Sequence, residues 1–245
     1  MKKILYIVLD GLGDLPIKEL NNKTPLEAAV TPHMDRLAQK GKMGLVYTVA
    51  KGIAPESDIA VISLLGYDAH KYYTGRGPLE SFAEGLVVQD GNLALRVNFA
   101  TVEDDARTIK DRRAGRNLTA DEAGALSKEI NSKVTLSGAT FEFKNTIGHR
   151  GVLVIRGMRS KLSGWITNTD PAYAREGVFG VAKEKFENFV VESLPMPGHE
   201  NSQEAKEASL LPLFPRARLS LFQLLRTLDL NTITIDISLK CWWGK

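Results

Sequence analysis

A short apolar run near the start of the chain constrains its fold more than any other feature. Ile4–Leu9 reads ILYIVL, which is rich in β-branched side chains and too short for the core segment of a helix. Such a run is typical of a buried central strand in an α/β sheet. It ends in the turn signal Asp10–Asp14, and α/β folds place their ligands at the carboxyl ends of their strands. The sequence therefore predicts an α/β fold with Asp10 at a ligand-binding edge.

The next segments continue this alternation of strands and helices as far as about residue 75. Thr24, Pro25 and Glu27 combine a cap, a first-turn proline and an acidic residue three positions after the cap, which predicts a helix start. The other predicted elements here are a helix from Thr31 to about Gly41, a strand over Met43–Val49 and a helix from near Ser57 to Leu65.

The pattern changes between about residues 76 and 190. One predicted helix, Thr119–Asn131, begins with Thr119 as its cap and Glu122 three residues on. The strands predicted around it are Phe82–Val88, Asn92–Thr101, Val134–Phe143 and Gly151–Arg156. This order predicts an inserted α+β domain, so that the chain divides into residues 1–75, 76–190 and 191–245.

The last part of the chain differs in composition from everything before it. Leu194–Ser202 reads as a linker, and Asn231–Leu239 alternates well enough to predict a strand. Leu210–Lys245 contains no glutamate but holds two of the three tryptophans and the single cysteine, Cys241. No histidine follows residue 200.

Composition excludes several classes of function. A net charge of +3 is too weak to indicate nucleic acid, which needs a strongly basic face. A single cysteine allows neither an internal disulfide nor a zinc site of the clustered-cysteine type. The sequence shows no secretory signal and no apolar run of the roughly 18 residues that a membrane span needs. We therefore expect a cytoplasmic protein with no membrane or nucleic-acid partner; its oligomeric state is left open.

Two residues stand where α/β enzymes hold metals or phosphates. Asp10 is placed as a hard-metal ligand, although turn aspartates commonly cap the next segment instead. Ser57 begins a predicted helix, where free N–H groups and the helix dipole would stabilise a phosphorylated or deprotonated oxygen. An ordinary N-cap serine is the alternative interpretation.

Basic residues gather in the middle of the chain. They are Arg96, the arginines within Asp111–Arg116 (Arg113 and Arg116 among them), His149 and Arg150. Arginine side chains bind carboxylates and phosphates through two parallel bonds, so the group could hold a doubly anionic substrate. A solvated charged surface and an ordinary loop histidine remain as alternatives.

A series of motifs in fixed order makes these separate signals more specific. The motifs are ILYIVLDGLGD, KTPLEAA, TPHMDRLA, SD at Ser57, LLGYD, YYTGRGPLE, RVNFATV, DRRAGR and GHRGVLV. Over about residues 1–200 the chain resembles the archaeal branch of the cofactor-independent, or 2,3-bisphosphoglycerate-independent, phosphoglycerate mutases of the alkaline phosphatase superfamily.

This resemblance implies a fold, an activity and a set of site residues. The fold is an alkaline-phosphatase-like α/β domain interrupted by an α+β domain. The activity is interconversion of 3-phosphoglycerate and 2-phosphoglycerate through a phosphoserine, with Ser57 as nucleophile. Two divalent metal ions, manganese, magnesium or zinc, would bind Asp10 and Ser57 among other ligands. The resemblance assigns substrate binding to Arg96, Arg113, Arg116, His149 and Arg150.

The sequence departs from the family pattern in two places. Thr167–Ala172 lacks the histidine of an acidic string that the family favours near Asp170. The resemblance fades after Glu207, where the family has a long continuation with most metal ligands; a frameshift is favoured over a divergent short relative. We therefore expect the chain by itself to be inactive or weak and prone to associate. A phosphatase or phosphonate hydrolase, or a non-catalytic anion-binding protein, are the other functions considered.

Overall fold

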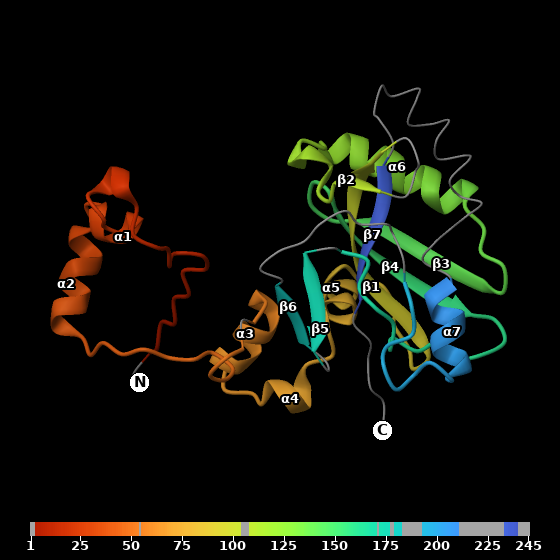
Figure 1. Ribbon diagram of the computed structural model, residues 1–245, viewed down its shortest axis with the longest axis horizontal. Helices are drawn as coiled ribbons and strands as arrows, with labels where there is room; N and C mark the ends of the chain where they lie inside the picture. The colour runs from red at the N-terminus through yellow and green to blue at the C-terminus, as the bar shows by residue number, and fades with distance from the viewer. Residues whose placement is uncertain are drawn as a thin grey trace. The chain divides into compact units, whose positions relative to one another are not determined.

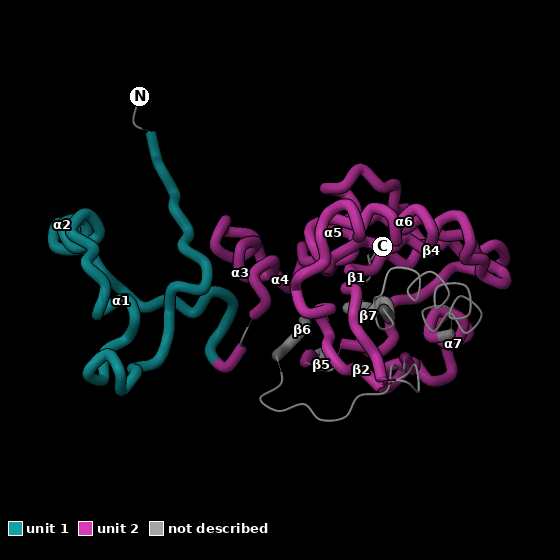
Figure 2. Tube along the Cα trace, turned by 90° about the horizontal axis from the view of Figure 1, so that it is seen from above, with its two compact units in different colours: residues 1–51 teal, residues 52–245 magenta. Residues whose placement is uncertain are grey.

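The computed structural model describes residues 3–53, 55–103, 108–170, 172–176, 179–182, 193–210 and 233–239 (Figure 1). The chain divides into two compact units, residues 1–51 and residues 52–245 (Figure 2). Within the described ranges, none of the helices is long and apolar enough to cross a bilayer. The predicted boundary at 190 and most of the segment Leu210–Lys245, with Cys241, lie outside the described residues.

The first unit contains three short helical segments. They are the 3-10 helix η1 (Lys18–Leu20) and the α-helices α1 (Pro25–Ala28) and α2 (Pro32–Lys40). Both predicted helix starts are confirmed. Thr24 and Glu27 form a reciprocal capping box on α1, in which the Glu27 N–H donates to the Thr24 hydroxyl over 3.2 Å. Helix α2 ends at Gly41, as the sequence indicated.

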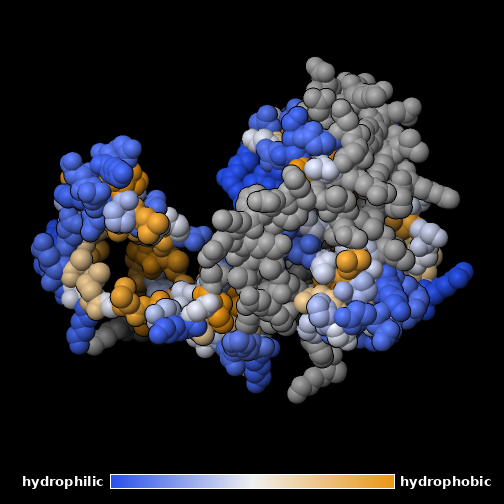
Figure 3. Space-filling model, in the orientation of Figure 1, coloured by the Kyte–Doolittle hydropathy of each residue, from blue (hydrophilic) through white to orange (hydrophobic). Residues whose placement is uncertain are grey.

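The two strands predicted in this unit do not form. Ile4–Leu9 and Met43–Val49 form no helix or strand, and most of their large apolar side chains are exposed, with Ile4 at 94%. Figure 3 shows apolar surface on this unit. A strand needs neighbours that accept and donate ladder hydrogen bonds, and among the described residues neither segment has such a partner. The predicted buried strand before Asp10 is therefore wrong for this structure.

An antiparallel sheet organises the second unit. Its strands are β1 (Asn92–Val102), β2 (Ile109–Asp111), β3 (Ala139–Asn145), β4 (Arg150–Gly157) and β7 (Ile233–Leu239). The order is β2-β1-β4-β3, and β7 pairs with β1 as well (Figure 1). The long strand β1 pairs with β4 from Asn92 opposite Arg156 to Asn98 opposite Arg150. The predicted strands at 92–101, 151–156 and 231–239 are thus confirmed over their described residues.

Side chains alternate along a strand, so the two faces of β1 pack against different helices. Leu93, Leu95, Val97 and Phe99 are buried on one face, in a core with side chains of α6 (Ala120–Lys133). The helix starts with the predicted capping box at Thr119. Ala94 lies on the opposite face, where helix α5 (Arg76–Ala83) covers the sheet. Arg96 and Asn98 follow Ala94 on that face and are also buried.

Two strand predictions in this unit need correction. The predicted strand Phe82–Val88 is instead the end of α5 and an irregular segment, because the helix begins at Arg76 and runs through Ala83. The predicted strand Val134–Phe143 begins later, as β3 at Ala139. Its first residues follow directly on α6 and turn at Gly138, which has a positive φ of 77°.

The remaining elements surround these layers. Helices α3 (Ser57–Leu64) and α4 (Ala69–Tyr72) precede α5, strands β5 (Tyr173–Glu176) and β6 (Phe179–Ala182) form a hairpin, and α7 (Gln203–Leu210) follows. The predicted linker 194–202 is partly anchored, since the Met196 N–H donates to the Trp165 carbonyl over 2.8 Å. The fold is mixed α/β with an antiparallel sheet.

Candidate functional site

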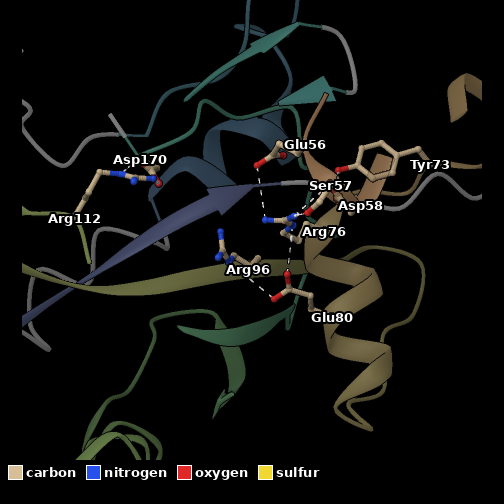
Figure 4. Close-up of polar contacts among 9 residues, drawn as sticks. All are labelled: Glu56, Ser57, Asp58, Tyr73, Arg76, Glu80, Arg96, Arg112 and Asp170. Carbon is tan, nitrogen blue, oxygen red and sulfur yellow. Dashed lines mark hydrogen bonds and ion pairs between the residues drawn. The ribbon is translucent and has the colours of Figure 1, made fainter. Parts of the chain in front are cut away.

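Ser57 is the first residue of α3 and is exposed to solvent. Its Oγ accepts a hydrogen bond of 2.9 Å from Nη2 of Arg76, the first residue of α5 (Figure 4). The starts of two helices therefore meet at one serine oxygen. The predicted helix at Ser57 is confirmed, whereas Arg76 was not among the predicted site residues.

Three carboxylates surround the Arg76 guanidinium (Figure 4). Its Nη1 lies 3.9 Å from Glu56, its Nη2 lies 3.5 Å from Asp58, and its Nε lies 3.4 Å from Glu80. Burial by itself would lower the pKa of Arg76, but the charges of Asp58, Glu56 and Glu80 outweigh it and raise the pKa. Arg76 is thus a fixed positive charge beside the serine.

Tyr73 ties the start of α3 to the end of α4. Its hydroxyl donates a hydrogen bond to Oδ2 of Asp58, the residue after Ser57. Burial, followed by the charge of Asp58, raises the pKa of the Tyr73 phenol, so the ring remains protonated and remains a donor. The bond fixes the first turn of α3 relative to the residues that lead into α5.

Glu80 connects Arg76 with Arg96 on the sheet. One carboxylate oxygen faces Arg76, and the other lies 4.0 Å from Nε of Arg96. Burial raises the pKa of Glu80 despite the opposing charges of Arg96, Arg76 and Arg150. Burial likewise lowers the pKa of Arg96, whose side chain is 7% exposed. A line of alternating charges therefore runs from Ser57 into the sheet.

A second group of charges centres on His149. Burial lowers the pKa of this imidazole, and the positive charges of Arg150, Arg96, Arg116 and Arg112 lower it further. Among the predicted residues, Arg96, Arg116 and Arg150 thus lie within electrostatic range of His149. Arg112 joins them, although the sequence did not predict a substrate-binding role for it. The group is a strongly positive environment suited to an anion.

The turn that carries Arg113 and Arg116 is held by Asp111. The two oxygens of Asp111 accept hydrogen bonds of 2.8 Å from the N–H groups of Arg113 and Gly115. Ala114 and Arg116 adopt left-handed backbone conformations, with φ of 45° and 57°. Non-glycine residues rarely do so, and such strain often marks a functional turn. Arg113 is held here through its backbone.

Arg112 is bound to a buried carboxylate instead of being free for an anion. Its Nε donates to Oδ1 of Asp170 over 2.7 Å, and its Nη2 donates to Oδ2. The Asp170 side chain is fully buried, and the guanidinium also lies 5.3 Å from the centre of the Tyr173 ring. In this structure, the loop near Asp170 therefore orients the arginine-rich turn.

Comparison with known proteins bears on what this arrangement is for. A family model for 2,3-bisphosphoglycerate-independent phosphoglycerate mutase matches residues 38–213. The chain belongs to this family. It is 49% identical over 195 residues to the phosphoglycerate mutase of Aeropyrum pernix, covering 79% of this chain and 45% of that one. The Methanopyrus kandleri mutase is 47% identical over 172 residues, covering 69% and 40%.

A solved structure has a similar fold. A Pyrococcus horikoshii protein superposes with a TM-score of 0.56 at 26% identity, covering 95% of this chain and 50% of that one. The chain spans less than half the length of the two curated phosphoglycerate mutases compared above.

The described residues include no group of three or more histidine, cysteine, aspartate or glutamate side chains arranged to hold a metal ion. Asp10 lies in the first unit, exposed beside Gly11, and Ser57 lies in the second. The predicted pairing of Asp10 with Ser57 on two metals stays a prediction.

Sequence reasoning missed the residues that link Ser57 to the sheet. Tyr73, Arg76 and Glu80 all lie in YYTGRGPLE, a motif that identified the mutase family without being assigned a role. Two glycines in it were the available signal. Gly75 has a φ of 96°, and a side chain on Gly77 would come within 2.1 Å of the Ala94 carbonyl.

Proposed function

We propose that this chain acts in the interconversion of 3-phosphoglycerate and 2-phosphoglycerate, with Ser57 as the phosphoryl acceptor. The observation that carries the proposal is the line Ser57, Arg76, Glu80 and Arg96, which leads from the hydroxyl of an exposed serine to the arginines around His149. Family membership supplies the substrate class.

The chemistry needs a nucleophilic oxygen and compensation of negative charge. Ser57 begins α3, where the N–H groups of the first turn and the positive end of the helix favour a phosphorylated oxygen. Arg96, Arg116 and Arg150 are suited to the phosphate and carboxylate of the substrate, and Arg113 is assigned with them. The lowered pKa of His149 keeps its ring neutral and able to accept a proton from a substrate hydroxyl.

Metal ions and domain organisation belong to the same proposal. Two divalent ions, manganese, magnesium or zinc, would lower the pKa of the serine hydroxyl, with Asp10 and Ser57 among their ligands. Further ligands would have to come from outside the described residues. We assign residues 1–75 to an alkaline-phosphatase-like domain that residues 76–190 interrupt. A cytoplasmic location, which the single cysteine fits, completes the proposal.

The test combines binding with turnover on the purified chain. Calorimetric titration with 3-phosphoglycerate is expected to show binding that Arg96→Gln and Arg150→Gln weaken and that Arg156→Gln, on the far end of β4, leaves unchanged. Phosphorus NMR with magnesium present then distinguishes 2-phosphoglycerate from free phosphate. Absence of binding would contradict the proposal.

The products separate this function from the alternatives. Formation of 2-phosphoglycerate that disappears in Ser57→Ala indicates a mutase complete in this chain. Release of free phosphate indicates a phosphatase. Binding without turnover, even with metal, indicates a substrate-binding part of a mutase or a non-catalytic anion-binding protein. We expect this outcome, because the residues that the structure describes contain no group of metal ligands.

A further inference from the structure

Arg76 contacts the atom that the proposed reaction uses. We propose that Arg76 activates the Ser57 hydroxyl as a nucleophile, and that Glu80 is a positioning residue that aims Arg76 at it. The inference rests on the proposed function in one respect, that Ser57 is the acceptor. It adds a residue to the site and a role to the motif YYTGRGPLE.

The direction of the hydrogen bond supports activation. Arg76 donates to Ser57 Oγ over 2.9 Å, so the oxygen is the acceptor and this bond does not use the hydroxyl's own proton. A cationic donor stabilises an alkoxide more than a neutral hydroxyl, because charge-assisted hydrogen bonds are the stronger ones. Ser57 is exposed to solvent, as a residue that reacts with an incoming phosphoryl group has to be.

The guanidinium is held in one orientation by its other partners. Glu80, one helical turn after Arg76, faces Nε at 3.4 Å, while Glu56 and Asp58 flank the two terminal nitrogens. A lysine ammonium is a single point charge and cannot face Ser57 and Glu80 through separate, fixed nitrogens. The arrangement therefore requires arginine at this position and a carboxylate at position 80.

The glycines on either side of Arg76 fit this role. Gly75 has a φ of 96°, which allows the chain to turn into α5 immediately before Arg76. Gly77 lets the first turn of α5 lie directly on β1, since a Cβ there would meet the Ala94 carbonyl at 2.1 Å. The helix start is thus pressed onto the sheet, and Arg76 projects toward Ser57 (Figure 4).

Reaction with a fluorophosphonate probe tests the inference on the whole chain without substrate or metal. Ser57 Oγ attacks phosphorus, an O–P bond forms, the P–F bond breaks, fluoride leaves, and the hydroxyl proton passes to solvent. Intact mass spectrometry gives the rate, and peptide mapping gives the site. We expect modification at Ser57, with Ser57→Ala as the unreactive reference.

The variants separate activation from structure. Arg76→Gln is expected to slow the modification about 10- to 100-fold, the range for losing a hydrogen bond to a charged group. Glu80→Gln should slow it less, and Arg76→Lys should restore little. Added guanidinium ion should restore part of the rate in Arg76→Ala, which a merely structural role would not allow. Arg156→Gln is the matched control, because Arg156 pairs with Glu142 away from Ser57.

Each outcome decides the inference. No modification of Ser57, or equal rates in the wild-type chain, Arg76→Gln and Glu80→Gln, would overturn it. If circular dichroism shows that Arg76→Gln is unfolded, Glu80→Gln decides, with a slowed rate supporting the inference and an unchanged rate overturning it. Arg76-dependent modification in a chain that does not bind 3-phosphoglycerate would keep the inference and remove the proposed function. Binding of 3-phosphoglycerate together with an unchanged modification rate in Arg76→Gln would keep the proposed function and overturn the inference.

Discussion

Residues 1–51 and residues 52–245 contain similar apolar runs but bury them very differently. In the second unit, alternate residues of β1, such as Leu93 and Leu95, are fully buried. In the first unit, Ile4 and Leu5 are 94% and 83% exposed. Both runs are rich in aliphatic residues, yet β1 has hydrogen-bonded neighbours on both sides. Burial of an apolar run therefore depends on the strands and helices that meet it.

Local signals behave alike in the two units. Thr24 with Glu27 and Thr119 with Glu122 form the same reciprocal capping box. The first caps a helix of four residues with none buried, and the second caps a helix of 14 residues with four buried side chains. A capping box forms within one turn of chain, whereas the stability that the helix contributes depends on what it packs against.

The largest expected difference between the units comes from removing an apolar side chain. Phe99 is 1% exposed and packs edge-to-face on Phe143 at 5.6 Å, so Phe99→Ala should lower the free energy of unfolding by about 3–5 kcal/mol. Ile7 is 67% exposed, and Ile7→Ala should change the free energy of unfolding by less than about 0.5 kcal/mol. Urea denaturation measures both. A cost above about 1 kcal/mol for Ile7→Ala would show that the first unit has a core.

A smaller effect is expected from a methyl group added to a glycine. Gly77→Ala places a Cβ within 2.1 Å of the Ala94 carbonyl, so α5 has to move away from β1 at a cost of about 1–3 kcal/mol. Gly44 in the first unit has nothing within 4 Å of such a Cβ, so Gly44→Ala should stay within about 0.5 kcal/mol. Thermal unfolding compares the two. Equal stabilities of Gly77→Ala and Gly44→Ala would show that α5 does not lie against β1 at Gly77.

The sequence predicted the elements that local patterns specify and missed those that depend on distant contacts. The capped helix at Thr119 and the strand at Asn92 were predictable, because caps and alternation are local patterns. Helix α5 was misread as a strand near Phe82, because its start depends on contact between Gly77 and Ala94, which are distant in sequence. The strand at Ile4–Leu9 was predicted from apolarity, without regard to a partner.

The site was predictable to a similar extent. Ser57 and the basic residues Arg96, His149 and Arg150 were selected by residue type and by resemblance, and their roles stay predictions. Arg76 and Glu80 were missed although glycines marked their motif, because their contacts arise from where α5 sits on β1. Whether Asp10 acts with Ser57 on a metal remains a prediction.

Removing the two caps compares the units more finely. Thr119→Ala should lower the global free energy of unfolding by about 1 kcal/mol, because α6 packs on the core. Thr24→Ala removes the same kind of hydrogen bond from α1, which buries none of its residues. This change should leave the global free energy of unfolding unchanged. Chemical denaturation provides the comparison. A loss of similar size in both variants would show that α1 is coupled to the cooperative core.

The smallest expected effect is a pH dependence in the second unit. The pKa of His149 is lowered from its ordinary 6.5 by burial and by Arg150, Arg96, Arg116 and Arg112. The unfolded chain therefore binds a proton at His149 before the folded chain does, and stability is lost as pH falls below about 6.5. His149→Gln should remove this part of the pH dependence. A stability loss of equal size in the variant would contradict the lowered pKa.

Hydrogen–deuterium exchange on the whole chain, with and without 3-phosphoglycerate, tests the central claim most directly. Without ligand, amides in Ile4–Leu9 should exchange rapidly, and those in β1 and β4 slowly. Ligand should add protection in the second unit around residues 57, 111–116 and 148–150. Ligand-dependent protection there supports a phosphoglycerate site in residues 52–245. Unchanged exchange at saturating ligand, or protection confined to the first unit, would contradict it.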